Sequence, residues 1–578
     1  MPISLRTHFF EAFKSFTGLK FFWRWSGPIP EDKPDNVMLA PSFPQLDMLD
    51  HPKIKAFITQ GGRPSIQEAL CSNVPIISIP IFADQDHNAM KLERIEALVR
   101  LDINTITEND IAKAIQQVLY NPKYSEKMGE LSRMFKDRPV DPLKNLVYWT
   151  EYALRHDTSL LKPLAMEQTW YQRRLLDVYG FLLVVFLTMI LFIEIVVGSN
   201  PRIEEIIPSK MCVFCASFYE SPEIQEWIVR PDLHFDLIFI DASLGECGYG
   251  LVHMFQAKHV LFFPAIPPYM FDAFGIVPES SIIEEKLNIT NLPPLVEFER
   301  NSSLVFVNHH FVEEYPVSLP PLFVPYSGLG CSKNTKVKPL PEKLANFIQD
   351  TDGFIYVSFG SAVIASAMPK SMRDTFFEAF EAFPNLKFFW RWTGTVPENT
   401  PKNVLLHDWF PQQDILAHPK IKGFITQGGR PSTQEALCHG VQMIMIPIMG
   451  DQDYNADRLE YLGAAQTLQI DTISASHIRG ALEKLLHNPE LAKKMKQISE
   501  MFRDRPIDPL ENAVYWTQYV LKYDTSLLKP LGMNQTWYER RLLDVYGFFI
   551  IGFIDTDYIN SSFNIFYSQI HVAHFISK

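Results

Sequence analysis

The sequence is short of the residues that mark several protein classes. It has 6 cysteines in 578 residues, which is too few for a disulfide scaffold. It has no basic run and a formal net charge of -13, which argues against a nucleic-acid-binding surface. No G-x-G-x-x-G follows a first strand, which disfavours a nucleoside-diphosphate-sugar epimerase or dehydrogenase.

Long apolar runs are scarce too. The opening MPISLRTHFFEAFKSF has no continuous apolar core, so we expect no secretory signal peptide. FLLVVFLTMILFIEIVVG (181–198) is 18 residues long, near the length that spans a bilayer. We predict a transmembrane helix over 179–198, with a buried core helix as the alternative. The stretch 549–578 sustains no such run, because Asp555 and Asp557 interrupt it, and is expected to be an irregular tail.

What is present is typical of a globular or membrane-associated chain. Hydrophobic residues make up 47% and aromatic residues 13%, and the length predicts several domains. Cys212 and Cys215 form a C-x-x-C without a second pair. We interpret them as two buried thiols, with a zinc site as the less favoured alternative, and we expect no metal.

The most informative stretch runs from 409 to 455. It contains an apolar strand pattern (421–426), the glycines Gly428 and Gly429, a helix pattern, a second apolar run (443–447) and a polar loop. Glycine lets a backbone approach a ligand closely, and a helix start offers unpaired N–H groups at the positive end of the helix dipole. The pattern therefore predicts a seat for a diphosphate, with an ordinary α/β turn as the alternative.

This order of elements resembles the signature of the UDP-glycosyltransferases, the family that includes the membrane-bound glucuronosyltransferases. The resemblance implies an α/β fold with GT-B-like, Rossmann-type domains, in which helices flank parallel sheets. It implies that Trp409 stacks on the uracil and that Gln412 bonds its edge. The other donor-binding residues that it implies are Ser358, Gly360, Ser361, Gln427, Gly429 and Ser432 at the diphosphate, Glu435 at the ribose, and Asp451 and Gln452 at the sugar.

Two positions depart from the family pattern. Gln427 stands where the family usually has histidine, and an amide donates a hydrogen bond but carries no charge. Gln442 stands where the family usually has proline.

The chain repeats itself. FITQGGRPSIQEAL at 57–70 reappears as FITQGGRPSTQEAL at 424–437, an offset of 367 residues. The period is too long for a solenoid repeat, so we interpret it as one domain present twice. We call residues 1–165 the first copy, which is truncated, and residues 342–548 the second copy, which is complete.

The first copy lacks two features of the second. Met1 aligns with Met368, so the segment GFIYVSFGS (353–361) has no counterpart, and Ser42 replaces Trp409. Aromatic stacking of a base contributes about 1–3 kcal/mol, so we expect the first copy to fold but to bind nucleotide poorly. It keeps the matching residues Gln45, Gln60, Gly61, Gly62, Ser65, Glu68, Asp84 and Gln85.

Residues 199–330 are expected to be part of another α/β domain, with strands at 235–240 and 258–263. Asp241 follows the first strand, at the end where open sheets place their ligands. The segment is similar to the latter part of the family's acceptor-binding domain, and Asp241 matches its catalytic aspartate.

The base histidine of the family is not found in a matching context. His309 and His310 are expected at a strand end, with a base or metal pair as the alternative. The proline-rich segments 264–268 and 316–325 are expected to be surface connections.

The resemblance implies metal-independent, inverting sugar transfer with a UDP-sugar as co-substrate and no other cofactor. A histidine would take a proton from an acceptor hydroxyl, an aspartate would hold that imidazole, and UDP would leave. The implied partners are a UDP-sugar, a small lipophilic acceptor, and related transferases in homo- or hetero-oligomers. The resemblance also implies association with a membrane, that of the endoplasmic reticulum.

Because the base histidine is missing, we expect UDP-sugar binding at the second copy but poor turnover. The alternative is a non-catalytic member that binds nucleotide-sugar or a partner. A helix spanning a membrane at 179–198 would put the two copies on opposite sides, so we interpret the chain as two fragmentary tandem paralogues joined together.

Overall fold

The computed structural model describes residues 2–158, 218–263 and 280–528, except for gaps at 83, 231, 242–245, 288, 290–291, 294, 316–318, 320–321, 334, 361–362 and 364. The chain divides into two compact units, Met1–Pro142 and Leu143–Lys578. The predicted transmembrane segment 179–198, the tail 549–578 and the pair Cys212 and Cys215 lie outside the described residues. Within the described ranges, no helix is both long enough and apolar enough to cross a membrane.

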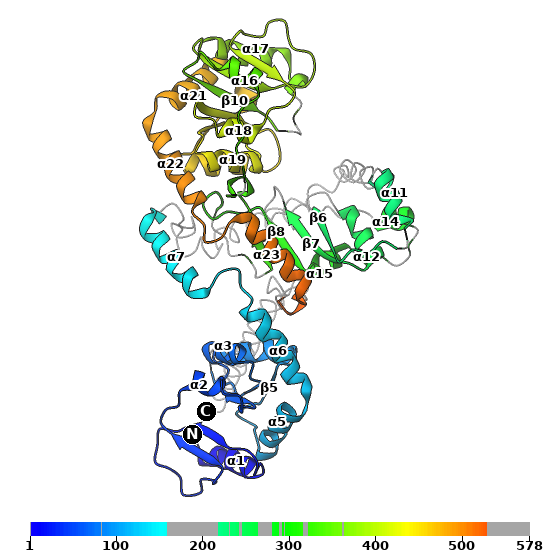
Figure 1. Ribbon diagram of the computed structural model, residues 1–578, viewed down its shortest axis with the longest axis vertical. Helices are drawn as coiled ribbons and strands as arrows, with labels where there is room; N and C mark the ends of the chain where they lie inside the picture. Colours follow the sequence, from blue (N-terminus) through cyan, green and yellow to red (C-terminus); the bar gives the residue numbers. More distant parts are fainter. Residues whose placement is uncertain are drawn as a thin grey trace, which may run out of the picture. The chain divides into compact units, whose positions relative to one another are not determined.

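The second unit contains a six-stranded parallel sheet in the order β12-β11-β10-β13-β14-β15 (Figure 1). Its middle strand β10 (Gly353–Ser358) pairs with β11 on one side and β13 on the other, and all six of its residues are buried. The other strands are β11 (Leu386–Arg391), β12 (Val404–His407), β13 (Ile421–Thr426), β14 (Met443–Met445) and β15 (Ala465–Thr467).

Helices cover both faces of this sheet, which explains why its strands are continuous apolar runs rather than alternating ones. On one face, Phe376, Phe380 and Leu482 pack against Ile355 and Val357 of β10. On the other face, a second cluster joins the aromatic residues of β10 to further helices. The helices of this half are α16 (Glu342–Phe347), η6 (Ala365–Ala367), α17 (Lys370–Glu381), α18 (Gln412–Leu416), α19 (Arg430–His439), α20 (Gln452–Tyr461), η7 (Ile470–Thr472), α21 (Ala475–His487), α22 (Pro489–Arg503), α23 (Pro509–Lys522) and η8 (Thr525–Leu528).

The same unit holds a four-stranded parallel sheet in the order β6-β7-β8-β9. Trp516 and Val520 of α23 pack on one face of it, against Val260 and Phe306. Its strands are β6 (Leu237–Asp241), β7 (Lys258–Phe263), β8 (Leu304–Val307) and β9 (Phe323–Pro325), and its helices are α11 (Pro222–Ile228), η3 (Glu246–Gly248), α12 (Tyr249–Phe255), α14 (Ser280–Leu287), α15 (Leu295–Asn301) and η5 (Leu329–Cys331).

The prediction that 316–325 is a surface connection is therefore wrong for its last three residues. Phe323–Pro325 is strand β9, and Val324 within it is 4% exposed. Proline is tolerated there because β9 is an edge strand, where one side of the backbone makes no ladder.

A disulfide joins Cys331 to Cys438 in the second unit, across 107 residues of chain. Cys247 is also disulfide-bonded. Six cysteines in 578 residues exclude a disulfide scaffold, but no prediction from the sequence concerned these three cysteines. Cys71, which matches Cys438 in the repeat, is a free and exposed thiol.

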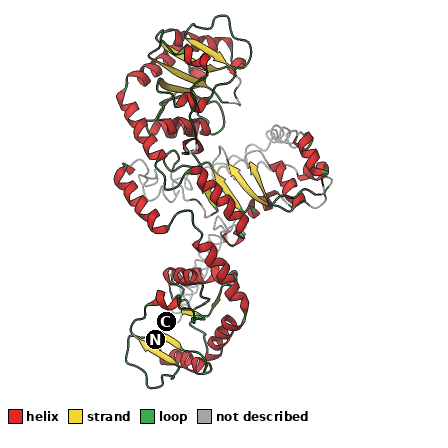
Figure 2. Ribbon diagram, in the orientation of Figure 1, coloured by secondary structure: helices red, strands yellow, loops and turns green. Residues whose placement is uncertain are grey.

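The first unit repeats the elements of the second-copy sheet, with one omission. Its strands form two separate parallel sheets, β1-β2 and β3-β4-β5 (yellow in Figure 2). They match β11 to β15 in order, whereas β10 has no counterpart among residues 2–142. The elements are α1 (Ile3–Lys14), β1 (Phe21–Arg24), β2 (Val37–Ala40), α2 (Gln45–Leu49), β3 (Phe57–Thr59), α3 (Arg63–Ser72), β4 (Ile76–Ser78), α4 (Gln85–Arg94), β5 (Leu98–Arg100), α5 (Glu108–Tyr120) and α6 (Pro122–Lys136).

The helix α7 (Pro142–Arg155) begins at the boundary between the two units in the sequence and packs within the second one. Tyr152 is 2% exposed, and its hydroxyl donates to the carbonyl oxygen of Met501 at 3.1 Å. The imidazole of His156 lies 2.7 Å from a carboxylate oxygen of Asp504. Helix α6 ends at Lys136 and α7 begins at Pro142, which agrees with the proline pattern between them.

Candidate functional site

The predicted donor-binding residues lie at one edge of the six-stranded sheet. Trp409 follows β12, Gly428 and Gly429 follow β13, and Asp451 follows β14. Because all six strands are parallel, their carboxyl ends meet at a single edge, which is where open α/β sheets bind ligands. Trp409 is 64% exposed, so its indole face is accessible to a flat ring.

Gln412, Ser432 and Glu435 form one hydrogen-bonded cluster between α18 and α19. The Gln412 amide nitrogen donates to a carboxylate oxygen of Glu435 at 2.6 Å and to the hydroxyl of Ser432 at 3.1 Å. Burial raises the pKa of Glu435, and the hydrogen bond from Gln412 opposes that rise. The cluster places a carboxylate and a hydroxyl side by side at the start of α19.

The glycine turn before α19 requires glycine. Gly428 has φ 91°, and a Cβ there would lie 2.6 Å from the terminal methyl carbon of Met445. Gly429 is the N-cap of α19 and makes no side-chain capping bond, and Pro431 lies in the first turn. Pro431 has no N–H, and the Ser432 N–H donates to the carbonyl oxygen of Gly429 at 3.1 Å, so the backbone N–H groups of Gly429 and Arg430 are the candidates for an anion site at this helix start.

Gln427 packs beside this turn. It is 8% exposed, and a side chain at Gly360 or Gly429 would crowd its amide nitrogen. The structure therefore brings Gly360, Gln427 and Gly429 together, as predicted. Ser358 is 2% exposed at the end of β10, and Ser361 lies outside the described residues.

Asp451 is held by Asn455 in the first turn of α20. The Asn455 amide nitrogen donates to a carboxylate oxygen of Asp451 at 3.0 Å and to the carbonyl oxygen of Gly428 at 2.9 Å. One side chain thus ties the predicted sugar-binding carboxylate to the glycine turn. Gln452 is 7% exposed, and its side-chain oxygen Oε1 accepts from the backbone N–H groups of Ile448 and Met449, so it shapes the loop before α20.

Arg430 is a residue that the sequence reasoning missed. It is 1% exposed, and its guanidinium forms a buried ion pair with Glu314. It also donates to the side-chain oxygen of Asn455 at 2.9 Å and to the carbonyl oxygen of Asn308 at 3.2 Å. Its Nε lies 3.7 Å from a carboxylate oxygen of Asp451. One guanidinium thus joins the predicted sugar-binding loop to the segment that follows β8.

That segment, residues 308–315, makes further buried contacts with α19 and α20. Gln434 donates to the side-chain oxygen of Asn308 at 2.6 Å and to Glu313 at 2.9 Å. The Tyr454 hydroxyl donates to Glu314 at 3.1 Å. Burial raises the pKa of Glu313 to about 7, against the opposing charge of Arg430.

A sequence signal for these contacts does exist. Glu313 and Glu314 are adjacent carboxylates in a short segment after an apolar strand, and Arg430 directly follows the glycine pair. Carboxylates are seldom buried without a cationic partner, so the two patterns could have been read as a pair.

Asp241 ends β6, at the carboxyl edge of the smaller sheet, and it is exposed. Its charge adds to the effect of burial in raising the pKa of Tyr326. His310 packs against the rings of Phe311 and Phe502 and is 4% exposed.

His309 follows β8, and burial together with the charge of Arg430 lowers its pKa to about 4. In the described part of the chain, no group of three or more histidine, cysteine, aspartate or glutamate side chains could hold a metal ion.

The first copy keeps part of this arrangement. Gln45 donates to Glu68 at 2.6 Å and to Ser65 at 3.3 Å, which repeats the cluster of the second copy. Arg63, the match of Arg430, is exposed. Ser42 supplies no aromatic ring in the place of Trp409.

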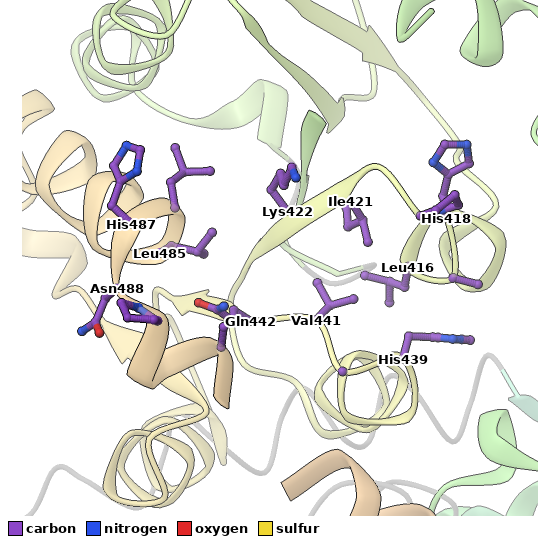
Figure 3. A pocket seen from close by; sticks show the side chains of 16 residues that line it. Leu416, His418, Ile421, Lys422, His439, Val441, Gln442, Leu485, His487 and Asn488 are labelled. Atoms are coloured by element: carbon purple, nitrogen blue, oxygen red, sulfur yellow. The ribbon is translucent and has the colours of Figure 1, made fainter. Parts of the chain in front are cut away.

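A cavity of about 510 Å³ opens at the other end of the six-stranded sheet, where β13 begins at Ile421. Figure 3 shows His418 and His439 on one side of it and His487 and Asn488 on the other. Burial lowers the pKa values of His418 and His439. The cavity shares no lining residue with the predicted donor site.

A model of the family described as "UDP-glucoronosyl and UDP-glucosyl transferase" matches residues 11–200 and 268–574. The chain belongs to this family. The match covers both copies of the repeated domain, together with much of the segment between them.

Curated relatives match about half of the chain. A UDP-glycosyltransferase, UGT5, of Dactylopius coccus is 35% identical over 273 residues, which are 46% of this chain and 51% of the relative. A UDP-glucuronosyltransferase of Pleuronectes platessa is 35% identical over 254 residues, 43% of this chain and 53% of the relative. A UDP-glucuronosyltransferase 1A6 of Mus musculus is 36% identical over 250 residues, 43% of this chain and 46% of the relative. The chain thus spans about half the length of the curated relatives it matches.

Solved structures are similar at lower identity. A UDP-glucosyltransferase from Polygonum tinctorium, solved with 3,4-dichloroaniline, is 15% identical, with a TM-score of 0.41 over 57% of this chain and 84% of that one. The glycotransferase of kitacinnamycin is 19% identical, with a TM-score of 0.40 over 53% of this chain and 81% of that one.

Proposed function

We propose that the second copy binds a UDP-sugar and that the chain is a glucuronosyltransferase-like UDP-glycosyltransferase, acting on a hydroxyl of a small lipophilic acceptor. One observation carries the proposal. Three groups lie at the same edge of the six-stranded sheet: the exposed indole of Trp409, the Gln412–Glu435 pair and the glycine turn at the start of α19. These are the groups that a base, a ribose diol and a diphosphate need.

The arrangement of charge favours departure of UDP. Negative charge grows on the diphosphate as the sugar–phosphate bond breaks, and the N–H groups of Gly429 and Arg430 would stabilise it. Asp451, held by Asn455 and close to Arg430, is placed to accept hydroxyls of the sugar. We propose no metal or further cofactor. The two parallel sheets of the second unit would belong to a GT-B-like pair of domains, with Asp241 on the acceptor side.

Catalysis by this chain is proposed to be slow. Asp241 would orient a base histidine, but the histidine of the family is absent from a matching sequence context. His309 is a poor substitute, because a pKa of about 4 makes its imidazole a weak base at neutral pH. A non-catalytic nucleotide-sugar-binding member is therefore the second candidate.

The setting we propose is the membrane of the endoplasmic reticulum, in company with related transferases. The Cys331–Cys438 disulfide supports an oxidising compartment, because such links persist where thiols are not kept reduced. The two matched copies support an origin by partial tandem duplication.

Calorimetric titration of the whole chain with UDP tests the proposal. We expect one site per chain, and Glu435→Gln should weaken binding roughly tenfold or more, since hydrogen bonds to charged groups contribute about 1.5–3 kcal/mol. The matched control is Glu68→Gln in the first copy, which should leave binding unchanged. Titration that shows no binding, or equal losses in the two variants, would contradict the proposal.

A separate assay of sugar transfer to a panel of phenols and hydroxylated lipids decides between the two candidates. Slow or absent turnover with intact UDP binding supports the non-catalytic reading. Rapid turnover would show that a residue other than the expected histidine acts as the base.

A further inference from the structure

The carboxylate of Asp451 is held through one of its two oxygen atoms. The Asn455 amide nitrogen donates to Oδ2 at 3.0 Å, and Nε of Arg430 approaches that same oxygen to 3.7 Å. Among the described residues, no group donates a hydrogen bond to Oδ1, although the Asp451 side chain is only 11% exposed. The protein thus engages Oδ2 and leaves Oδ1 available to accept a hydrogen bond from a ligand.

The first copy shows how much of this arrangement the amide alone provides. Asn88 donates to a carboxylate oxygen of Asp84 at 2.9 Å and to the carbonyl oxygen of Gly61 at 3.3 Å, which repeats the contacts of its match in the second copy. Asp84 is nevertheless exposed, and so is Arg63. The amide therefore ties the carboxylate to the glycine turn in both copies, whereas the buried guanidinium beside the carboxylate is found in the second copy.

The guanidinium of Arg430 is itself fixed by its surroundings. Its contacts with Glu314, Asn308 and Asn455 all use the two terminal nitrogens. A cation that is 1% exposed needs a neutralising partner, and the buried carboxylate of Glu314 supplies it. Nε has no hydrogen-bond partner among the described groups, and it lies within reach of the electrostatic attraction of Asp451. The fixed guanidinium therefore presents Nε to that carboxylate.

We propose that Arg430 is a positioning residue for the donor sugar. It holds Asp451 through Oδ2 and so leaves Oδ1 for the sugar hydroxyls, while Glu314 keeps the arginine fixed. The inference rests on the proposed function, because it takes Asp451 as the acceptor of those hydroxyls. A carboxylate whose orientation is already fixed loses less freedom on binding, so the arginine strengthens sugar binding without touching the sugar. Recognition of the sugar then depends on a side chain of segment 308–315, which follows β8 of the smaller sheet.

Calorimetric titration of the whole chain with UDP and with UDP-glucose isolates the sugar contact, because the ratio of the two Kd values cancels the contributions of base, ribose and diphosphate. UDP-glucose shares its C2, C3 and C4 hydroxyls with UDP-glucuronate, so it serves as the probe for either sugar. Arg430→Gln would leave Glu314 buried without its cation, so the test uses Arg430→Met with Glu314→Leu, which removes both charges. We expect the ratio of the Kd for UDP-glucose to that for UDP to rise about fivefold in this double variant, a typical coupling between neighbouring residues, while the Kd for UDP stays nearly constant. The matched control is Arg63→Met in the first copy, which should leave the ratio unchanged.

A mutant cycle with Asp451→Asn distinguishes positioning from a merely structural role. This variant alone should raise the ratio at least as much as the double variant does. Adding the double variant to it should cause no further rise, because the arginine acts through the Asp451 carboxylate. Additive effects would overturn this inference, and so would an unchanged ratio in the double variant with UDP still bound, while the proposed function would stand. Failure of the native chain to bind UDP would overturn the proposed function and this inference together.

Discussion

The two copies of the repeated sequence differ in which of their matching side chains are buried. Arg63 and Arg430 both follow the letters FITQGG and begin matching helices, α3 and α19. Arg63 is exposed, whereas Arg430 is 1% exposed and paired with Glu314. The difference comes from the partner, since residues 308–315 pack against the second copy. Burial of a charge is thus decided by what covers it and not by its local sequence.

The largest effect that separates the copies is expected from removing this charge. Arg430→Gln leaves Glu314 buried without its cation and should reduce the free energy of unfolding by about 3–5 kcal/mol. Arg63→Gln should change it by less than about 0.5 kcal/mol, because the side chain is at the surface. Denaturant unfolding of the full chain measures both.

A double variant sharpens that test. Replacing the pair by apolar residues, Arg430→Met with Glu314→Leu, should recover much of the loss, because buried ion pairs give little net stability over apolar packing. Equal effects of the single variants Arg430→Gln and Arg63→Gln would refute the comparison.

The next largest effect on stability is expected from the cysteines. Cys438 is linked to Cys331, whereas its match Cys71 is free. Replacing Cys331 and Cys438 together by alanine should destabilise the second unit by about 2–4 kcal/mol, and Cys71→Ala should have little effect. Alkylation of the native chain checks the assignment. Cys71 should react without reductant, and reaction of Cys438 under the same conditions would contradict the disulfide.

Trp409 and Ser42 allow a reciprocal exchange. Trp409→Ser should weaken UDP binding by about 1–3 kcal/mol, the contribution of stacking to one base. Ser42→Trp in the chain as given should create no second site, because residues 2–142 include no strand that matches β10 and no match of Gly360. Calorimetry with UDP compares the two variants. A gain of a second site on Ser42→Trp would show that one ring is all that the first copy lacks.

The last prediction concerns a residue without any match in the first unit. Folding raises the pKa of Glu313 from its ordinary 4.5 to about 7. The folded state therefore holds the proton more tightly, and the free energy of unfolding should fall as the pH rises from 4.5 to 7. Glu313→Gln should remove this part of the pH dependence. Parallel pH profiles of melting temperature for the two proteins would contradict the prediction.

Local features of the sequence predicted much of the fold. The apolar run at 421–426 became β13 with the same bounds, and the predicted strand at 258–263 became β7. The predicted residues Gln412, Ser432 and Glu435 do meet. These successes concern residues within one or two elements of each other, where spacing alone fixes the contact.

Contacts between distant segments were not predicted. Arg430 meets Asn308 and Glu314 across more than a hundred residues, and Cys331 meets Cys438 across a similar separation. The adjacent carboxylates Glu313 and Glu314 suggest a cationic partner, but the spacing of residues in the sequence identifies neither that partner nor the partner of Cys331. The strand Phe323–Pro325 was missed because the prolines of 316–325 indicated a loop, although an edge strand tolerates Pro325.

The short bond between Gln412 and Glu435 recurs between Gln45 and Glu68, although the sheet beneath the second of these pairs is split in two. This hydrogen-bonded pair is therefore positioned by two neighbouring helices, α2 and α3 or α18 and α19, and not by the sheet beneath them. A match to the family signature in such a stretch therefore shows only that the hydrogen-bonded glutamine–glutamate pair is present. The pair alone does not show that a complete nucleotide pocket is present.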